Sequence, residues 1–216
     1  SRPLIHALGV IKQGAAKVNA EMDNIPEDVA HAIQLAAQEV IDGKLDEHFP
    51  IDIYQTGSGT SSNMNANEVI AHRAMELVPD LSVKVHPNDH INFGQSSNDT
   101  FPTAIRIAGY IEAKNVLIPV LKFLRETFLK KGAEYSHVVK TGRTHLMDAM
   151  PVTVEQEFGG YARQIEIGIQ RIESALQQMA ELPMGGTAVG TGINTDPEFP
   201  PKFAAEISKL SGESFR

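Results

Sequence analysis

The chain has 216 residues with 42% hydrophobic content, which is enough to bury one large core or two smaller ones and argues against disorder. Its net charge of −8, without any cluster of basic residues, excludes a nucleic-acid backbone as the expected partner, and the absence of cysteine excludes disulfides and thiolate metal sites. No apolar run approaches the ~20 residues of a membrane span and no signal-peptide pattern opens the sequence, so we expect no membrane association and a cytoplasmic location.

The first half of the sequence predicts helices separated by irregular segments. Residues 3–22 carry apolar side chains at spacings of three and four, which is typical of a helix with one buried face. Pro26 begins a second helical pattern that continues to Val40. A third helix is predicted over residues 62–78.

The second half is dominated by longer helical patterns. Residues 103–132 predict a helix that Pro119 kinks or breaks, and residues 199–211 predict a last, shorter one. The clearest element covers residues 152–181, where apolar side chains form a single stripe typical of a helix-bundle seam. The stripe consists of Val154, Phe158, Tyr161, Ile165, Ile169, Ile172, Leu176 and Met179. Because only Val138–Thr141 shows a strand-like pattern, we predict an all-α fold.

Three polar segments precede or separate these helices and are candidates for a binding site. They are Gly57–Asn65, Gln95–Thr100 and Gly142–Asp148. Each is rich in hydroxyl, amide and backbone N–H groups, which bind a small anion without adding a titrating charge. His145 in the third segment can transfer a proton near neutral pH, although a single histidine is more often a surface or structural residue. It lies just before a short helix that we expect to end at Met150-Pro151.

Helix capping is the alternative explanation for the first two segments. Ser61, Ser62 or Asn63 fit as N-caps of the third helix, and Asp99 or Thr100 fit as caps of the helix that follows them. Capping and anion binding are compatible, since the unpaired N–H groups of a helix N-terminus attract anions.

Together with three further motifs, the polar segments resemble the fumarase/aspartase superfamily, and within it the class II fumarases. The further motifs are His86–Asn92, Phe101–Ala104 and Gly185–Gly192. The resemblance implies an N-terminal domain over residues 1–95 and the first part of a central helix bundle over residues 96–216. It also implies a homotetramer with sites shared between subunits, and no cofactor.

One motif of that family does not occur in the sequence. This is the loop Gly-Ser-Ser-x-Met-Pro-x-Lys-x-Asn, which in the family carries a serine base and a lysine that binds substrate. We therefore expect the chain to be a truncated portion of such an enzyme, inactive alone.

The resemblance implies roles for individual residues. Fumarate and malate are the implied substrates, held through their carboxylates by Ser58, Thr60, Ser96, Ser97, Asn98 and Thr144. His145 is implied to act on the water that is added or removed. Aspartases resemble the chain almost throughout but usually have glutamine in place of this histidine, so aspartase is the alternative activity.

His86, Asn88 and Asp89 match a peripheral anion site of the class II fumarases. The residues alone predict a turn, in which Pro87 fixes φ and Asn88 or Asp89 makes an Asx-type hydrogen bond. Val83 stands where the family often has a basic residue, which weakens the case for the anion site. We reject a metal site here, because no pair of ligands is spaced i, i+4 on a predicted helix.

Two functions of different classes are consistent with these observations. The first is a hydro-lyase of the citric acid cycle, which adds water reversibly across the double bond of fumarate to give (S)-malate. The second is a noncatalytic helical module that folds and oligomerises. The stripe over residues 154–179 favours the second, because it needs partner helices to cover it.

Overall fold

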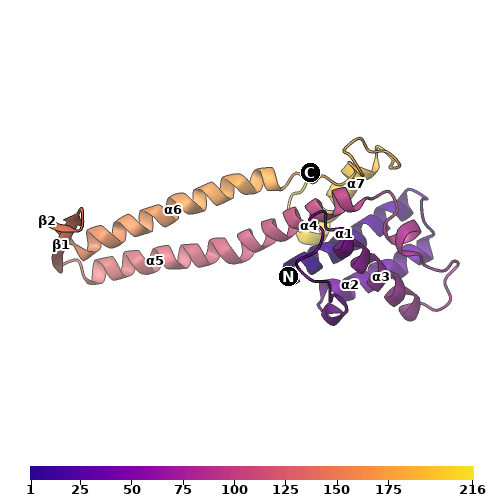
Figure 1. The fold of residues 1–216 in the computed structure, drawn as a ribbon, viewed down its shortest axis with the longest axis horizontal. Helices are drawn as coiled ribbons and strands as arrows, with labels where there is room; N and C mark the ends of the chain where they lie inside the picture. Colours follow the sequence, from indigo (N-terminus) through magenta and orange to yellow (C-terminus); the bar gives the residue numbers. More distant parts are fainter. The chain divides into compact units, whose positions relative to one another are not determined.

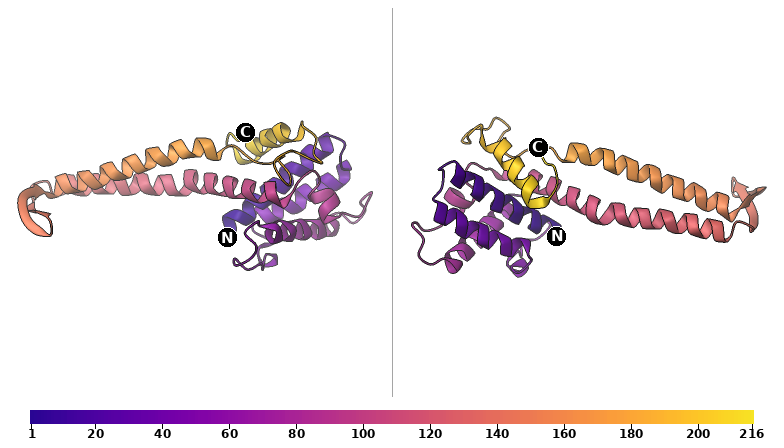
Figure 2. Two further views of the ribbon diagram at one scale, coloured as in Figure 1. Left: turned by 45° about the horizontal axis from the view of Figure 1, so that its top comes forward. Right: turned by 180° about the vertical axis from the view of Figure 1, so that it is seen from behind.

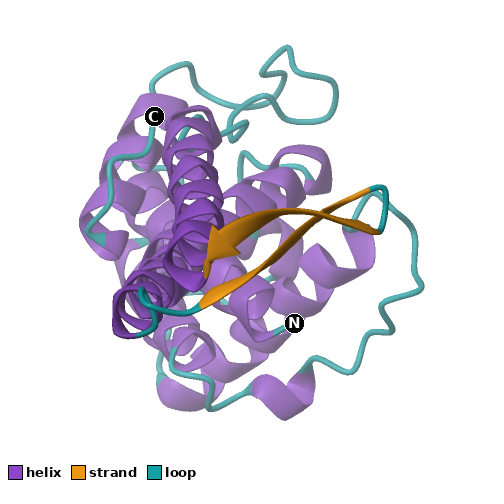
Figure 3. Ribbon diagram, turned by 90° about the vertical axis from the view of Figure 1, so that its left-hand side faces the viewer, coloured by secondary structure: helices purple, strands orange, loops and turns teal.

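The computed structural model describes all residues from 1 to 216, and it is helical apart from one β-hairpin (Figures 1 and 3). The predicted all-α fold class is confirmed. The chain forms two compact units, residues 1–109 with 179–216 and residues 110–178. The domain boundary expected at residues 95 and 96 refers to the complete fold of the family and stays a prediction. No helix combines the length and the apolar character needed to cross a bilayer.

The first unit has a core between its first three long helices. Its elements are α1 (Arg2–Glu21), α2 (Glu27–Ile41), η1 (Asp46–His48), α3 (Thr60–Leu77), η2 (Pro87–Ile91), most of α4 (Ser97–Glu112) and α7 (Phe199–Ser211). Ile33, Val40 and Ile70 are fully buried in this core. A Cβ on Gly9 would lie only 2.9 Å from Ile41 Cγ1, so glycine lets α1 and α2 pack closely.

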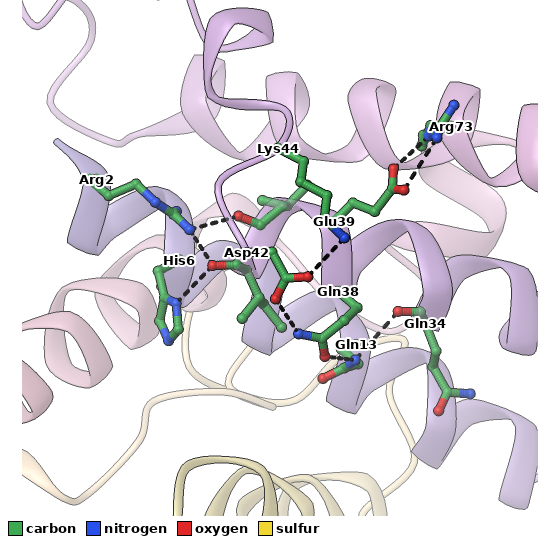
Figure 4. A network of polar contacts seen from close by, with 11 residues as sticks. Arg2, His6, Gln13, Gln34, Gln38, Glu39, Asp42, Lys44 and Arg73 are labelled. Atoms are coloured by element: carbon green, nitrogen blue, oxygen red, sulfur yellow. Dashed lines mark hydrogen bonds and ion pairs between the residues drawn. The ribbon is translucent and has the colours of Figure 1, made fainter.

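Polar side chains join the outer surfaces of the same helices (Figure 4). Arg2 donates to the carbonyl oxygens of Val40, at 3.0 Å, and Ile41, and so pairs two of the carbonyls left free at the end of α2. Arg73 of α3 donates to Glu39 of α2 at 2.6 Å, and these hydrogen bonds hold the pKa of that carboxyl below its ordinary value.

The last segment of the chain returns to the first unit and packs on α1. Lys17 Nζ lies 2.9 Å from Glu206 Oε1, and a Cβ on Gly14 would lie 2.8 Å from Ile207 Cδ1. Phe199 and Phe203 of α7 are fully buried and stack on each other.

The second unit is an antiparallel pair of helices joined by the β-hairpin, and Figure 2 shows the two helices side by side. Its elements after the end of α4 are the π-helical turn η3 (Ala113–Leu117), α5 (Ile118–Glu134), β1 (Val139–Thr144), β2 (Met147–Thr153) and α6 (Val154–Met179). Lys122 pairs with Glu173 at 3.7 Å. Near the other end of α5, the rings of Phe128 and Phe158 lie 5.5 Å apart.

Most helix predictions are confirmed, and residues 199–211 match α7 at both ends. Pro119, the predicted kink or break, lies in the first turn of α5, directly after the π-helical turn η3. The hydrogen-bond pattern therefore changes near the predicted position, while the backbone stays helical from α4 to α5. The short helix expected to end at Met150-Pro151 was wrong, because residues 147–153 pair with β1 as strand β2. The helix predicted from residue 103 begins six positions earlier, at Ser97.

Candidate functional site

Ser96 and Asp99 form a reciprocal cap at the start of α4. Ser96 Oγ accepts a hydrogen bond from the Asn98 amide at 3.2 Å, and Asp99 Oδ1 accepts one from the Ser96 amide at 2.9 Å. Asp99 was one of the two predicted caps, and Ser96 is the N-cap itself. The arrangement holds Ser96, Ser97 and Asn98 at the positive end of the helix.

The second oxygen of Asp99 has a role that the sequence pattern did not indicate. This buried carboxylate accepts hydrogen bonds at Oδ2 from the amides of Gly185, at 3.1 Å, and Thr187, at 2.8 Å. Asn98 Nδ2 also donates to the Ala188 carbonyl at 2.9 Å. The glycine-rich loop is therefore attached to the first turn of α4, and the Asn98 side chain is partly committed to this attachment.

A glycine brings the first polar segment against α4. Gly59 is the N-cap of α3 with φ +71°, and a Cβ there would lie 2.0 Å from the ring of Phe101. The predicted side-chain caps Ser61, Ser62 and Asn63 were therefore wrong, because α3 begins at Thr60 with no side-chain cap. Ser58 and Thr60 flank the glycine, exposed to solvent, with their hydroxyl oxygens 3.1 Å apart.

A partly buried chain of hydrogen bonds connects α1, α3 and α4 behind these residues. Asn63 Nδ2 donates to Ser97 Oγ at 3.0 Å and to Asn92 Oδ1 at 3.1 Å. Lys12 Nζ donates to the same Asn92 oxygen and to Gln95 Oε1, both at 2.9 Å. Lys12 is 0% exposed, and burial lowers its pKa to about 7 although the negative charge of Asp99 acts in the opposite direction.

The first unit thus brings together five of the predicted binding residues, Ser58, Thr60, Ser96, Ser97 and Asn98. Ser96, Ser97 and Asn98 lie at a helix N-terminus, and contacts of the neighbouring Gly59 and Asn63 bring the segment of Ser58 and Thr60 against the same helix. Neutral hydroxyl and amide groups at a helix N-terminus are suited to holding a carboxylate. Lys12 and Asn63 were not among the predicted residues. The helical spacing contained a signal for Lys12. It lies four residues after Leu8 and seven before Asn19, which places it on the same buried face of α1 as these two residues.

The proposed peripheral anion residues form an exposed turn. His86 Nδ1 accepts from the amides of Asn88 and Asp89, each at 3.3 Å, so the imidazole plays the part expected of an Asx side chain. The Asx-type bond predicted for Asn88 or Asp89 was therefore wrong. Asp89 Oδ2 lies 3.1 Å from the same nitrogen. Anion binding at this turn stays a prediction, and the adjacent carboxylate opposes it.

Thr144 and His145 belong to the second unit, at the end of the β-hairpin. Thr144 pairs with Met147, leaving His145 and Leu146 as a two-residue turn with φ +49° and +62°. Positive φ at both positions is the type I′ geometry that usually selects asparagine and glycine. Both side chains are exposed. Neither unit by itself contains the full set of predicted residues.

Comparison with known proteins gives consistent matches along the chain. A profile of a family described as lyase matches residues 2–215. The mitochondrial fumarate hydratase of Saccharomyces cerevisiae is 52% identical over 216 residues, which cover 99% of this chain and 44% of that protein. The class II fumarate hydratase of Corynebacterium glutamicum is 55% identical, over 96% of this chain and 43% of that protein. A crystal structure of class II fumarase from Schistosoma mansoni superposes with a TM-score of 0.93 at 40% identity, covering 98% of this chain and 45% of that one. The chain spans less than half the length of these relatives.

Proposed function

The chain belongs to the lyase family, and on that basis we propose that a protein of the relatives' length containing it is a class II fumarate hydratase. We refer to that longer polypeptide as the full-length protein. The proposed reaction is the reversible hydration of fumarate to (S)-malate in the citric acid cycle. The observation that supports it best is the group of neutral donors, Ser58, Thr60 and Ser96–Asn98, around the N-terminus of α4.

The chemistry requires that a carboxylate be held while negative charge grows on it. Removal of a proton from the carbon next to a carboxylate produces a carbanion, which is stabilised as the aci-carboxylate. Hydroxyl and backbone N–H donors at a helix N-terminus stabilise that charge without changing protonation themselves. His145 acts on the water, and a serine on the family's missing loop acts as the base at carbon.

We propose that sites of the full-length protein are shared between subunits of a cytoplasmic homotetramer. His145 and Thr144 lie in a different unit from the other proposed residues. Val120 and Phe123 on α5 are 57% and 74% exposed, and such apolar surface supports burial against further helices. This surface also supports the noncatalytic assembly module as the function of the isolated chain.

Substitution of His145 by asparagine in the full-length protein tests the assignment. We expect kcat to fall by a factor on the order of 10² or more, with stability nearly unchanged because the side chain is exposed. His137→Asn is the matched control, since His137 is an exposed histidine of the same unit. A His145 variant within about threefold of wild type would remove this residue from the mechanism.

Aspartase is the second candidate activity, and the assay is direct. Ammonia elimination needs a site arranged around an ammonium leaving group, and an imidazole at His145 suits water better. We expect malate dehydration to be far faster than conversion of aspartate to fumarate. Equal rates for the two substrates would assign the protein to the aspartases.

Measurements on the isolated 216-residue chain distinguish between the two proposed functions, the enzyme and the assembly module. We expect it to be inactive, because its sequence contains no serine-bearing loop, and to associate through its exposed apolar surface. Turnover measurements and light scattering on the same sample test both expectations. A monomer with near-normal activity would show that a residue present here, such as Ser97, serves as the base.

A further inference from the structure

We propose that Lys12 is a positioning residue for the proposed site, because it helps to set the direction of a partly buried chain of hydrogen bonds and thereby makes Ser97 a donor toward the bound carboxylate. The inference rests on the proposed function. It adds to the site a residue of α1 that is fully buried and acts through other side chains.

The direction begins at Lys12, whose amine keeps at least two N–H donors whether it is charged or neutral. Both donors face side-chain amides, so each of those amides presents its oxygen. Asn92 and Gln95 both do so, at 2.9 Å. The opposite ends of these two amides agree with that orientation, since Asn92 Nδ2 donates to the Gln95 carbonyl at 3.2 Å and Gln95 Nε2 to the Ile91 carbonyl at 3.0 Å.

The fixed oxygen of Asn92 then determines the orientation of Asn63. Only the nitrogen of the Asn63 amide can donate to Asn92 Oδ1, so Nδ2 also faces Ser97 Oγ, 3.0 Å away. Asn63 Oδ1 is buried and has no hydrogen-bond partner in the protein. Nothing at that end of the amide opposes a flip, so its orientation depends on Asn92 Oδ1. Lys12 binds this oxygen at 2.9 Å, Asn67 Nδ2 donates to it at 3.3 Å, and the bond from Asn92 Nδ2 to the Gln95 carbonyl keeps it facing them.

The consequence for Ser97 concerns its single proton. A hydroxyl group has one donor and two acceptor positions, and Asn63 occupies one acceptor. The Ser97 O–H is therefore free to donate to an anion at the N-terminus of α4. If the Asn63 amide flipped, its oxygen would compete for that proton, and the substrate carboxylate would lose a donor.

Two substitutions disturb the chain at different points. Lys12→Met removes the donor with little change in volume. Asn63→Asp replaces the amide by a carboxylate of the same shape, which accepts from Ser97 instead of donating to it. Lys17→Met is the matched control, because Lys17 lies on the same helix and pairs with Glu206, away from Ser97.

The experiment measures fumarate hydration by the full-length protein in a double-mutant cycle with Ser97→Ala. We expect Ser97→Ala, Lys12→Met and Asn63→Asp each to lower kcat/KM about tenfold or more, largely through KM. Combining Ser97→Ala with either of the other two should cost no more than about threefold beyond Ser97→Ala alone. Lys17→Met should leave KM unchanged.

The proposal would be overturned if, in both double variants, the loss in kcat/KM equalled the product of the losses in the two single variants, because the residues would then act independently. A normal KM in Asn63→Asp would overturn it as well, even if Lys12→Met failed to fold. Absence of fumarate hydration in the wild-type protein is a separate result and would reject the proposed function instead.

Discussion

Substitution of Lys12 by methionine should change how stability depends on pH. The pKa of this lysine is 10.5 in its ordinary environment and about 7 in the folded protein, where burial disfavours the charged form. Between these two values the unfolded chain binds more protons than the folded one, so the free energy of unfolding of the wild type rises with pH. Integrated from roughly pH 6 to pH 9, this contribution amounts to about 2.5 kcal/mol. The methionine variant lacks it.

Urea unfolding of the 216-residue chain, followed by far-ultraviolet circular dichroism at one protein concentration, measures the effect. The free energy of unfolding of wild type minus that of Lys12→Met should increase by about 2.5 kcal/mol between roughly pH 6 and pH 9. For Lys17→Met the same difference should stay flat, because the hydrogen bond to Glu206 raises the pKa of Lys17 and keeps it charged throughout. A Lys12 difference constant to about 0.5 kcal/mol would refute the reasoning.

Three further substitutions test other contacts. Asp99→Asn removes the charge that holds the amides of Gly185 and Thr187. We expect the free energy of unfolding to fall by about 2–3 kcal/mol and hydrogen exchange at those two amides to become faster. Unchanged exchange would contradict the attachment of the glycine-rich loop to α4. Gly59→Ala places a methyl group against the Phe101 ring at a position with positive φ. We expect the free energy of unfolding to fall by about 2 kcal/mol or more and KM of the full-length protein to rise. No change in either quantity would contradict the close contact between Gly59 and Phe101. Leu146 has a left-handed backbone conformation at an exposed position, which glycine adopts without strain. Leu146→Gly should therefore raise the free energy of unfolding by up to about 1 kcal/mol. A decrease would show that the Leu146 side chain makes a stabilising contact.

The helices were predictable because their signal is local. The apolar spacing within α1, α2 and α7 needs no knowledge of the packing partner. Strand β2 was missed because it carries no alternating pattern and contains Pro151, and because His145-Leu146 lacks the glycine or asparagine that marks a tight hairpin turn.

The interior of the site was less predictable, since its contacts join distant parts of the sequence. Asp99 was predicted as a cap from its local sequence, although the partner in that cap, Ser96, was not. The bond from Asp99 to Thr187 spans 88 residues, and the one from Lys12 to Asn92 spans 80. No local pattern reports which amides a buried lysine or carboxylate will meet, so Lys12, Asn63 and the second role of Asp99 emerged only from the structure.

The return of the chain to α1 has a consequence for synthesis on the ribosome. The face of α1 that receives α7 is made early, yet Lys17 meets Glu206 only 189 residues later. About 90 of these residues lie between residue 109 and α7, and they include the whole second unit. At roughly 5–20 residues per second, the 189 residues between these two partners take roughly 10 to 40 seconds to be made, and the nascent α1 waits that long for its cover. During that interval the face of α1 that α7 later covers is exposed and can bind chaperones. Slow translation of residues 110–198 lengthens the exposure.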